Sequence, residues 1–256
     1  MAKSLKIGII GCGFIGKKII ENFKNDIKWV YDIDYEKCIR IKKEKKAKFK
    51  CLRVINKSEV KNVDLVVECA SQNAVKKFGN FILRYSNLLI ASVGALSDIK
   101  FLKNLRNVAK RNNKKIFIPN GAIGAIDALQ SLGTLEKVKI TTIKNPKSLG
   151  MNNQEKQIVF HGNAKDACEK FPKNINVAAT LSIFGIGFDK TEVEIISDPN
   201  ATKTKHIVEA ESKNSIAKLK FEIESIPSDE NPKTSVTAAN SIIKGINNFK
   251  NEIICV

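Results

Sequence analysis

A run of glycines near the N-terminus has the spacing of a phosphate-binding turn. Gly11, Gly13 and Gly16 form a GxGxxG pattern within the segment GCGFIG. The first glycine permits a tight turn, the second lets a phosphate approach the backbone, and the third lets a helix pack closely on a strand. The N-terminus of the helix that follows would offer N–H groups and a partial positive charge to a diphosphate. We therefore predict that Gly11, Gly13, Phe14, Ile15 and Gly16 contact a dinucleotide.

An acidic residue follows at the position expected for a ribose contact. Asp32 comes after the next predicted strand, near the usual offset of about 20 residues from the first glycine. A carboxylate there can accept hydrogen bonds from both ribose hydroxyls of NAD and would repel the extra phosphate of NADP. Asp34 is the alternative acid, and Lys37 and Arg40 lie close enough in sequence to leave NADP open. We predict NAD as the cofactor, with NADP as the alternative.

A candidate for proton transfer lies in the second half of the chain. His206, one of two histidines, opens a predicted strand and shares a face with Val208 and Ala210. An imidazole titrates near neutral pH, so it can take a proton or activate a water molecule. A histidine beside a buried face is also a common structural residue, and the residue pattern alone leaves both roles open.

The elements around the glycine turn form a strand–turn–helix–strand unit. Leu5–Ile10 is a short apolar run typical of a buried strand, Lys17–Lys24 has helical spacing, and Lys28–Tyr31 is a second strand. The continuing alternation predicts strands at 63–67, 88–93 and 115–118 and a helix at 99–112. Apolar strands that alternate with helices predict a doubly wound parallel sheet covered on both faces, which is a Rossmann domain.

The pattern changes after residue 120. We expect a helix at 125–135, a strand at 138–143, and three further strands at 192–196, 206–211 and 217–226. Their short connections favour antiparallel neighbours, and the last strand alternates between apolar and charged residues, which predicts one buried and one solvent face. A final helix at 236–249 is expected to pack back on the first domain. We therefore predict an α/β protein in two domains, residues 1–120 with 234–256 and residues 121–233, the second built on an open mixed or antiparallel sheet.

Composition restricts the partners. The 256 residues include 44 Lys+Arg and 26 Asp+Glu, a net charge of +18, which raises nucleic acid as a partner. Most of these basic residues are lysines, whereas arginine is the usual reader of bases. We expect the dense run Lys42–Lys50 to be a solvated helix face, and we predict no nucleic-acid partner.

The cysteines and the hydropathy indicate the compartment. No apolar run reaches the ~18 residues of a membrane span, and no signal peptide is expected. None of the six cysteines forms a CxxC pair, and only two histidines are present to complete a metal site. We predict reduced thiols, no metal, no membrane association and a cytoplasmic location.

Motifs along the second half resemble the L-aspartate dehydrogenase family. After GCGFIG, the chain carries Gly121–Asp127 (GAIGAID), Phe171–Leu181 (FPKNINVAATL), Asp198-Pro199 and His206 in this order. The resemblance extends over nearly the whole chain and is most specific in FPKNINVAATL. It implies NAD(P)-dependent oxidation of L-aspartate to iminosuccinate, which hydrolyses to oxaloacetate and ammonia or feeds NAD biosynthesis through quinolinate. It also implies that the second domain is the catalytic domain and that its open sheet builds a homodimer.

The resemblance assigns roles to three residues. Ala122, through its backbone, and Asn176 match cofactor-contact positions, and His206 matches the active-site histidine. An ordinary glycine turn at Ala122 and a helix cap at Asn176 remain alternatives. His161 departs from the family pattern, and we expect it to be a surface or structural residue.

Two other functions remain open from the sequence. One is a different two-domain NAD(P) oxidoreductase, such as a dihydrodipicolinate-reductase-like enzyme, although the chain lacks the adjacent histidine pair of that family. The other is a non-catalytic protein that binds NAD or nucleic acid. The sequence does not identify the cations that would hold the two carboxylates of an aspartate substrate.

Overall fold

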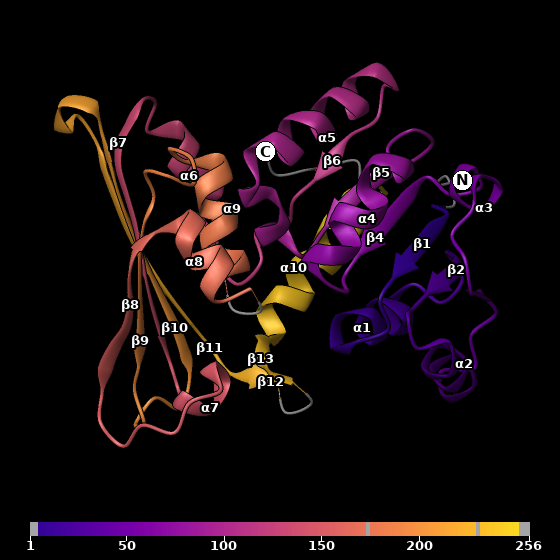
Figure 1. Ribbon diagram of the computed structural model, residues 1–256, viewed down its shortest axis with the longest axis horizontal. Coiled ribbons are helices and arrows are strands. Elements are labelled where there is room, and N and C mark those ends of the chain that lie inside the picture. The colour runs from indigo at the N-terminus through magenta and orange to yellow at the C-terminus, as the bar shows by residue number, and fades with distance from the viewer. Residues whose placement is uncertain (1–4, 173–174, 229–230, 251–256) are drawn as a thin grey trace. The chain divides into compact units, whose positions relative to one another are not determined.

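The computed structural model describes residues 5–172, 175–228 and 231–250 (Figure 1). The described residues divide into two compact units, one of residues up to Pro119 together with residues 242–250, and one of Asn120–Ser241. The first junction lies next to the predicted one. The second junction falls inside the last helix instead of before it. That the two units act as a dinucleotide domain and a catalytic domain stays a prediction.

The first unit is built on a six-stranded sheet with the strand order β3-β2-β1-β4-β5-β6, and every strand pair in it is parallel. This is the doubly wound order of a Rossmann domain, so the predicted fold class is confirmed. The strands are β1 (Ile7–Ile10), β2 (Ile27–Tyr31), β3 (Lys50–Leu52), β4 (Leu65–Glu68), β5 (Asn87–Ile90) and β6 (Ile116–Phe117). The connecting helices are α1 (Phe14–Asn22), α2 (Tyr35–Glu44), α3 (Lys57–Lys61), α4 (Gln72–Ile82), α5 (Ile99–Arg111) and the 3₁₀ turn η1 (Val93–Ser97).

The central strands of this sheet are buried on both faces. Every residue of β1 and β4 is buried, as the uninterrupted apolar runs predicted. The core also includes Ile242 and Ile246 of the last helix, α10 (Val236–Asn247). Burying each large aliphatic side chain contributes about 1.5–3 kcal/mol before the entropy of ordering is subtracted.

The second unit is built on a five-stranded mixed sheet in the order β11-β10-β7-β9-β8. Its strands are β7 (Leu135–Lys144), β8 (Gln157–Asn163), β9 (Glu192–Ser197), β10 (Thr204–Ser212) and β11 (Lys218–Ser225). The antiparallel pairing of β10 with β11 is confirmed. The expectation that β9 and β10 are neighbours is wrong, because β7 lies between them, parallel to β9 and antiparallel to β10.

The two faces of this sheet differ. On β10, alternate residues from Thr204 to Ser212 are buried and the residues between them are half-buried. Helix α8 packs against β8 and β9, and Figure 1 shows α8 and α9 along the same side of the sheet. We call this side the covered face and the opposite side the open face. The remaining elements of the unit are α6 (Ile126–Ser131), α7 (Pro146–Leu149), α8 (Ala164–Lys170), α9 (Asn176–Phe184), η2 (Lys213–Ser215), β12 (Pro227–Ser228) and β13 (Asn231–Ser235).

Two local predictions are wrong in extent. The helix expected to reach residue 135 ends at Ser131, because Gly133 has φ +76° and β7 begins at Leu135. The run Lys42–Lys50 is not one helix face, since α2 ends at Glu44 and Lys50 already belongs to β3.

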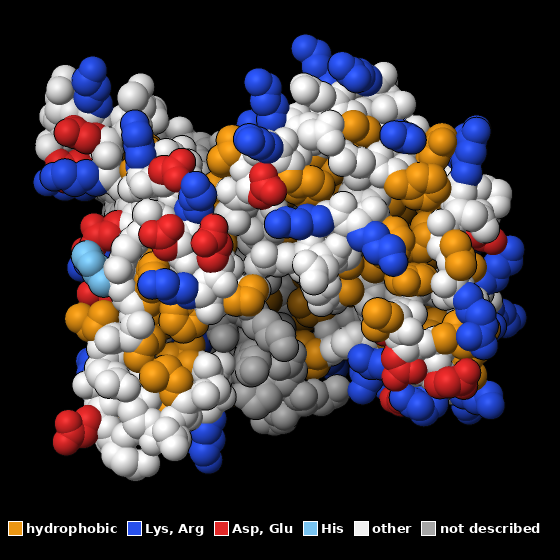
Figure 2. Space-filling model, viewed as in Figure 1, with side chains coloured by type: hydrophobic (Ala, Val, Ile, Leu, Met, Phe, Trp, Pro, Cys, Tyr) orange, Lys and Arg blue, Asp and Glu red, His pale blue; other side chains and the backbone are white. Residues whose placement is uncertain are grey.

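The surface and the thiols bear on the partner predictions. Figure 2 shows lysine and arginine side chains spread over the visible face and interspersed with acidic ones. In the described parts of the chain, no helix is long and apolar enough to cross a membrane, and no group of three His, Cys, Asp or Glu could hold a metal ion. Cys12, Cys38, Cys51, Cys69 and Cys168 are free thiols, whereas Cys255 lies outside the described residues.

Candidate active site

The glycine turn has the backbone that its sequence predicts. Gly11 follows β1 with φ +106°, and a Cβ there would lie 2.8 Å from the Cys69 carbonyl oxygen. A Cβ on Gly16 would overlap the Gly11 carbonyl oxygen, so α1 can pack this closely only because residue 16 has no side chain. Both glycines are therefore required by the fold of the turn itself.

Gly13 differs from the other two glycines. It is the N-cap residue of α1, with φ −69° and ψ −166°, a conformation that any residue adopts. A Cβ on Gly13 would meet no atom within 4 Å. The turn is thus open at the one glycine that a diphosphate must approach, and the first N–H groups of α1 start there. The residues present fit the dinucleotide that the sequence predicted.

Asp32 is fixed against this turn. Its Oδ2 accepts a hydrogen bond from the Cys12 N–H at 2.6 Å, and its Oδ1 accepts one from the Asp34 N–H at 3.0 Å. Each carboxylate oxygen has a second lone pair, so both can still accept from ribose hydroxyls. Asp34, the alternative acid, caps α2 by accepting from the Lys37 N–H at 2.9 Å, and its other oxygen lies 3.5 Å from Arg40. The geometry favours Asp32 as the ribose acid.

A buried carboxylate that the sequence did not predict lies at the end of β4. Glu68 Oε1 accepts from the N–H groups of Ala70 (2.8 Å) and Ser71 (2.9 Å) and from the Ser92 hydroxyl (2.9 Å). Its Oε2 accepts from the Ser92 N–H at 3.1 Å. Burial raises the pKa of Glu68, and these hydrogen bonds oppose that rise. The side chain holds together the loops that follow β4 and β5, at the carboxyl edge where open α/β sheets bind ligands. The only hint of this site in the sequence was a charged residue at the end of an apolar run.

His206 is buried on the covered face of the second sheet, with 2 % of its surface exposed. Its Nδ1 lies 2.9 Å from Oγ1 of Thr142, the residue directly opposite it on β7. When Nδ1 carries the proton and donates to Thr142, the lone pair of Nε2 is directed away from β7. Burial, and secondarily the charge of Lys144, lowers the pKa of His206 to about 3, so the imidazole is neutral at neutral pH.

Lys144 is the second residue that sequence analysis missed. It ends β7 two residues after Thr142, on the same covered face, and is 6 % exposed. Burial lowers its pKa to about 8. The alternation of β7 already places residue 144 on the side of Thr142. In a sequence, a lysine at the end of a strand nevertheless indicates a solvent-exposed position, and only the structure shows that Lys144 is buried.

The glycine loop before α6 lies close to a cross-strand neighbour of His206 in the second sheet. Gly121 has φ +69° and donates its N–H to the Ser241 hydroxyl at 3.0 Å, and Ala122 is 6 % exposed. A Cβ on Gly124 would lie 3.7 Å from Cδ1 of Ile223, the cross-strand partner of His206. One residue of this loop, Gly124, thus lies next to the cross-strand partner of His206.

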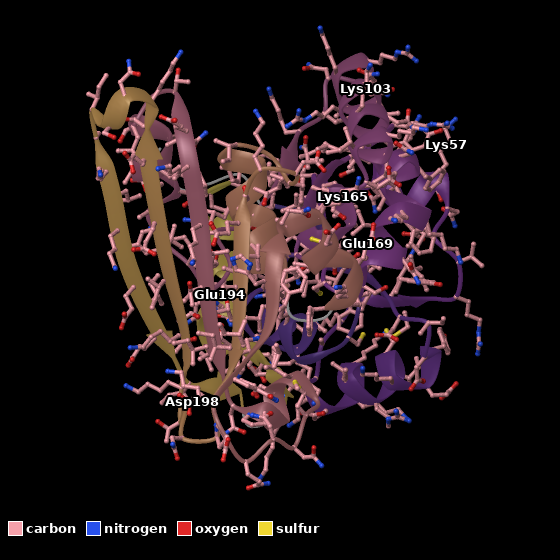
Figure 3. All side chains as sticks on the ribbon, turned by 60° about the vertical axis from the view of Figure 1, so that its left-hand side comes forward. Lys57, Lys103, Lys165, Glu169, Glu194 and Asp198 are labelled. Carbon is pink, nitrogen blue, oxygen red and sulfur yellow. The ribbon has the colours of Figure 1, made fainter. Side chains whose placement is uncertain are left out.

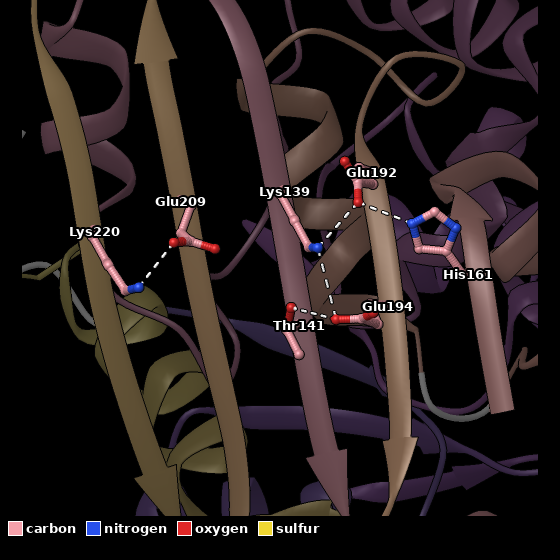
Figure 4. A network of polar contacts seen from close by, with 7 residues as sticks. All are labelled: Lys139, Thr141, His161, Glu192, Glu194, Glu209 and Lys220. Atoms are coloured by element: carbon pink, nitrogen blue, oxygen red, sulfur yellow. Dashed lines mark hydrogen bonds and ion pairs between the residues drawn. The ribbon is translucent and has the colours of Figure 1, made fainter. Parts of the chain in front are cut away.

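Asn176 and His161 lie on different elements of the second unit, α9 and β8. Asn176 is the first residue of α9, half-buried, and the N-cap position belongs to Ile175, so the alternative of an N-cap at Asn176 is wrong. His161 lies on the open face, with its Nε2 3.1 Å from Glu192, and its side chain is 61 % exposed (Figure 4). The expectation of a surface role for His161 is confirmed.

The structure therefore groups the predicted residues in two sets, each within one unit. The glycine turn and Asp32 form one set in the first unit. Ala122, Asn176 and His206 belong to the second unit, where His206 is joined by Thr142 and Lys144. The first set can hold a dinucleotide, and in the second set Lys144 supplies a positive charge near a neutral imidazole.

Family models match both halves of the chain. A model described as "Aspartate dehydrogenase, C-terminal" matches residues 126–249. A model described as "Homoserine dehydrogenase, NAD binding domain" matches residues 11–119. The two matched segments correspond to the second sheet with its helices and to the doubly wound sheet.

Full-length relatives give the same result. L-Aspartate dehydrogenase of Thermotoga maritima is 39% identical over 248 residues, which cover 96% of this chain and 98% of the relative. L-Aspartate dehydrogenase of Methanocaldococcus jannaschii is 39% identical over 259 residues, with 94% and 95% covered. The crystal structure of aspartate dehydrogenase from Thermotoga maritima superposes with a TM-score of 0.80 at 33% identity, covering 98% of this chain and 99% of that one. Myo-inositol dehydrogenase from Lactobacillus casei, at 13% identity and a TM-score of 0.56, shares the fold alone.

Proposed function

The chain belongs to the L-aspartate dehydrogenase family, and we propose that it catalyses the NAD-dependent oxidation of L-aspartate to iminosuccinate. The observation that carries the proposal is the buried, neutral His206, positioned by Thr142 on a sheet of the family's C-terminal type. Iminosuccinate then hydrolyses to oxaloacetate and ammonia or serves the biosynthesis of the pyridine ring.

The cofactor-binding part of this proposal rests on the first unit. The N–H groups at the start of α1 bind the diphosphate, Gly13 gives it room, and Asp32 accepts hydrogen bonds from the adenosine ribose. Phe14 and Ile15 are the first two residues of α1, and we assign further cofactor contacts to Ala122 and Asn176. When bound, the nicotinamide ring supplies the hydride acceptor.

The proton chemistry rests on the second unit. The amine of L-aspartate must lose a proton before the C–H bond breaks, because the nitrogen lone pair forms the new C=N bond as hydride leaves Cα. His206 takes that proton on Nε2, while Thr142 holds Nδ1 and fixes the plane of the ring. Afterwards the same imidazole can activate the water that attacks the imine. Hydride transfer requires a distance of about 3–3.5 Å between the reacting carbons, which substrate-binding groups must enforce.

We infer that NAD is preferred over NADP. The carboxylate of Asp32 stands where the ribose hydroxyls must bind, and it would repel the additional phosphate. Of the two cations that left NADP open, Arg40 lies beside Asp34 at 3.5 Å. Arg53 stacks over the Tyr35 ring at 3.8 Å and is a further cation at this end of the site. Comparison of the Michaelis constants for NAD and NADP tests the inference, and a strong preference for NADP would contradict it.

We further propose a homodimer that uses the open face of the second sheet. Charges on this face are paired across strands: Lys139 lies 3.1 Å from Glu192, and Lys220 lies 2.9 Å from Glu209 (Figure 4). Paired charges lose less on desolvation than single ones, so such a face can be buried against a second copy. Sedimentation equilibrium measures the assembly, and a monomer at all concentrations would contradict it. A cytoplasmic location also remains a prediction.

The proposed function is tested by a substrate screen. We expect NADH to form when L-aspartate and NAD are added, and not with L-glutamate, L-alanine or L-asparagine as controls. The reverse reaction should consume NADH when oxaloacetate and ammonia are supplied together. Activity with dihydrodipicolinate and none with L-aspartate would favour the reductase alternative. Steeply salt-dependent binding to DNA without any dehydrogenase activity would favour a nucleic-acid-binding protein.

A further inference from the structure

The covered face of the second sheet changes from apolar to polar along the strands. The strand register defines rows of side chains that run across β11, β10, β7 and β9. Two rows at one end are apolar, formed by Leu219, Ala210 and Val138 and by Phe221, Val208, Ile140 and Val193. The next row is Ile223, His206, Thr142 and Ile195. In the last row, Ser225 on β11 pairs with Thr204 on β10, and Lys144 on β7 pairs with Ser197 on β9. Continuing the pairing of β10 with β7 by one residue beyond Lys205 and Ile143 places Thr204 opposite Lys144. We call these last four residues the polar row.

The polar row is buried although it contains a lysine. Ser225, Thr204 and Lys144 are 6 %, 5 % and 6 % exposed, and Ser197 is fully buried. The row thus places one basic side chain and three hydroxyl side chains directly beside His206.

The backbone around Lys144 is held in place by the loop after β9. The Lys144 carbonyl oxygen accepts from the Asp198 N–H at 2.9 Å, and Asp198 is labelled at this end of the sheet in Figure 3. The side-chain amide of Asn145 donates to the carbonyl oxygens of Pro199 (3.2 Å) and Ala201 (3.3 Å). The Asp198-Pro199 motif is thus used to fix the strand end that carries the lysine.

One hydroxyl of the polar row lacks a partner. The Ser225 Oγ is buried and, within the described residues, makes no hydrogen bond. The Ser197 hydroxyl, by contrast, donates to Asn153 at 2.7 Å. An unsatisfied buried hydroxyl costs about 1–3 kcal/mol. A carboxylate oxygen bound in this row would give the Ser225 hydroxyl an acceptor.

We propose that the polar row binds a carboxylate of the substrate, with Lys144 supplying the positive charge and Ser225 and Thr204 donating hydrogen bonds, next to His206. This rests on the proposed function, in which the substrate is a dicarboxylate with one amino group. Lys144 lies diagonal to His206 across β7 and β10, a separation that a short dicarboxylate spans. The row thereby supplies a cation for the carboxylates, which the sequence did not identify.

The first test replaces the cation. Lys144→Met keeps the length of the side chain and removes its charge. We expect the KM for L-aspartate to rise roughly 10- to 100-fold, the KM for NAD to stay unchanged, and inhibition by succinate to weaken by the same factor as aspartate binding. Lys137→Met is the matched control, since Lys137 is exposed on the open face of the same strand. Aspartate and succinate constants within threefold of the wild type would overturn the proposal.

The second test uses the unpartnered hydroxyl. Ser225→Ala removes a buried group without a partner, so the thermal stability of the protein alone should stay equal or rise, while the KM for L-aspartate rises roughly 3- to 10-fold. Ser212→Ala is the matched control at the other end of β10, because the Ser212 hydroxyl is hydrogen-bonded to Ala217. It should lose stability and keep its KM. An unchanged KM for L-aspartate in Ser225→Ala would overturn the role of Ser225, whatever the stability of the variant.

Failure of the two proposals can be distinguished. Succinate binding in the presence of NADH, measured by calorimetry, needs no turnover. Tight succinate binding that Lys144→Met abolishes supports the polar row even if L-aspartate is not oxidised. Oxidation of L-aspartate with normal kinetics in Lys144→Met supports the proposed function and overturns the polar row.

Discussion

Substitution of Gly13 separates cofactor binding from folding. Gly13 has ordinary extended backbone angles, and a Cβ there would meet no atom within 4 Å. Gly13→Ala should therefore change the free energy of unfolding by less than about 1 kcal/mol, and the loss of glycine entropy in the unfolded chain favours the folded state. The methyl group would occupy the space that the diphosphate must enter.

The effect on binding follows from the contacts that the methyl group prevents. Hydrogen bonds between backbone N–H groups and a charged phosphate contribute about 1.5–3 kcal/mol each. Loss of one such bond corresponds to a roughly 10- to 150-fold rise in the dissociation constant of NADH. We expect this rise with an unchanged melting temperature.

The assay pairs NADH titration with thermal unfolding, and Gly16→Ala is the control. A Cβ on Gly16 would overlap the backbone carbonyl of Gly11, so this variant should lose stability as well as binding. Gly13→Ala that binds NADH within twofold of the wild type would refute the placement of the diphosphate on this turn. A Gly13→Ala variant that is as unstable as Gly16→Ala would show that the open space at Gly13 is misassigned.

Four further outcomes follow from the geometry. Asp32→Ala should lower the ratio of kcat/KM for NAD to that for NADP by at least tenfold, and an unchanged ratio would remove Asp32 from ribose recognition. His206→Ala should reduce kcat by about 10²–10⁴ with cofactor binding intact, whereas near-full turnover would exclude His206 from proton transfer. Thr142→Val should reduce kcat by about tenfold, because Nδ1 loses its partner, and KM measurements should show cofactor affinity unaffected. The folded pKa of His206, about 3, lies below its ordinary 6.5, so the stabilising effect of the neutral ring is complete above pH 6.5 and is lost as the pH falls toward 3. Urea unfolding at pH 6.5 and 5 should show the wild type losing about 2 kcal/mol more than His206→Gln, and equal losses would contradict the burial of a neutral imidazole.

Local patterns predicted the first unit well. The apolar run before Gly11, the glycine spacing and the acid after the next strand each depend on neighbours close in sequence, and all three recur in the structure as β1, the turn and Asp32. The choice between Asp32 and Asp34 needed coordinates, because both are acids after the same strand. Only the structure shows that Asp34 caps α2.

The second unit was harder because its sheet depends on distant pairing. β9 and β10 are close in sequence, yet β7 lies between them, and no local signal encodes that insertion. Lys144 was missed for the same reason: its burial results from the strands that flank β7 and from the covering elements. The end of α6 was predictable, since a glycine with a left-handed backbone conformation stands at residue 133.

The buried carboxylate of Glu68 illustrates a third limit. Its position at the end of an apolar run was visible, but its four hydrogen bonds come from two loops that the sequence does not place together. The sequence alone therefore shows which residue types stand at strand ends, but only the three-dimensional structure shows which of them are buried.

Deuterium transfer tests the central claim most directly. L-Aspartate labelled with deuterium at C2 should pass its label to the nicotinamide ring, so that mass spectrometry finds one deuterium in each NADH formed, and His206→Ala should slow this transfer without altering its destination. Formation of unlabelled NADH, or no reduction of NAD or NADP by L-aspartate at any concentration, would contradict the account.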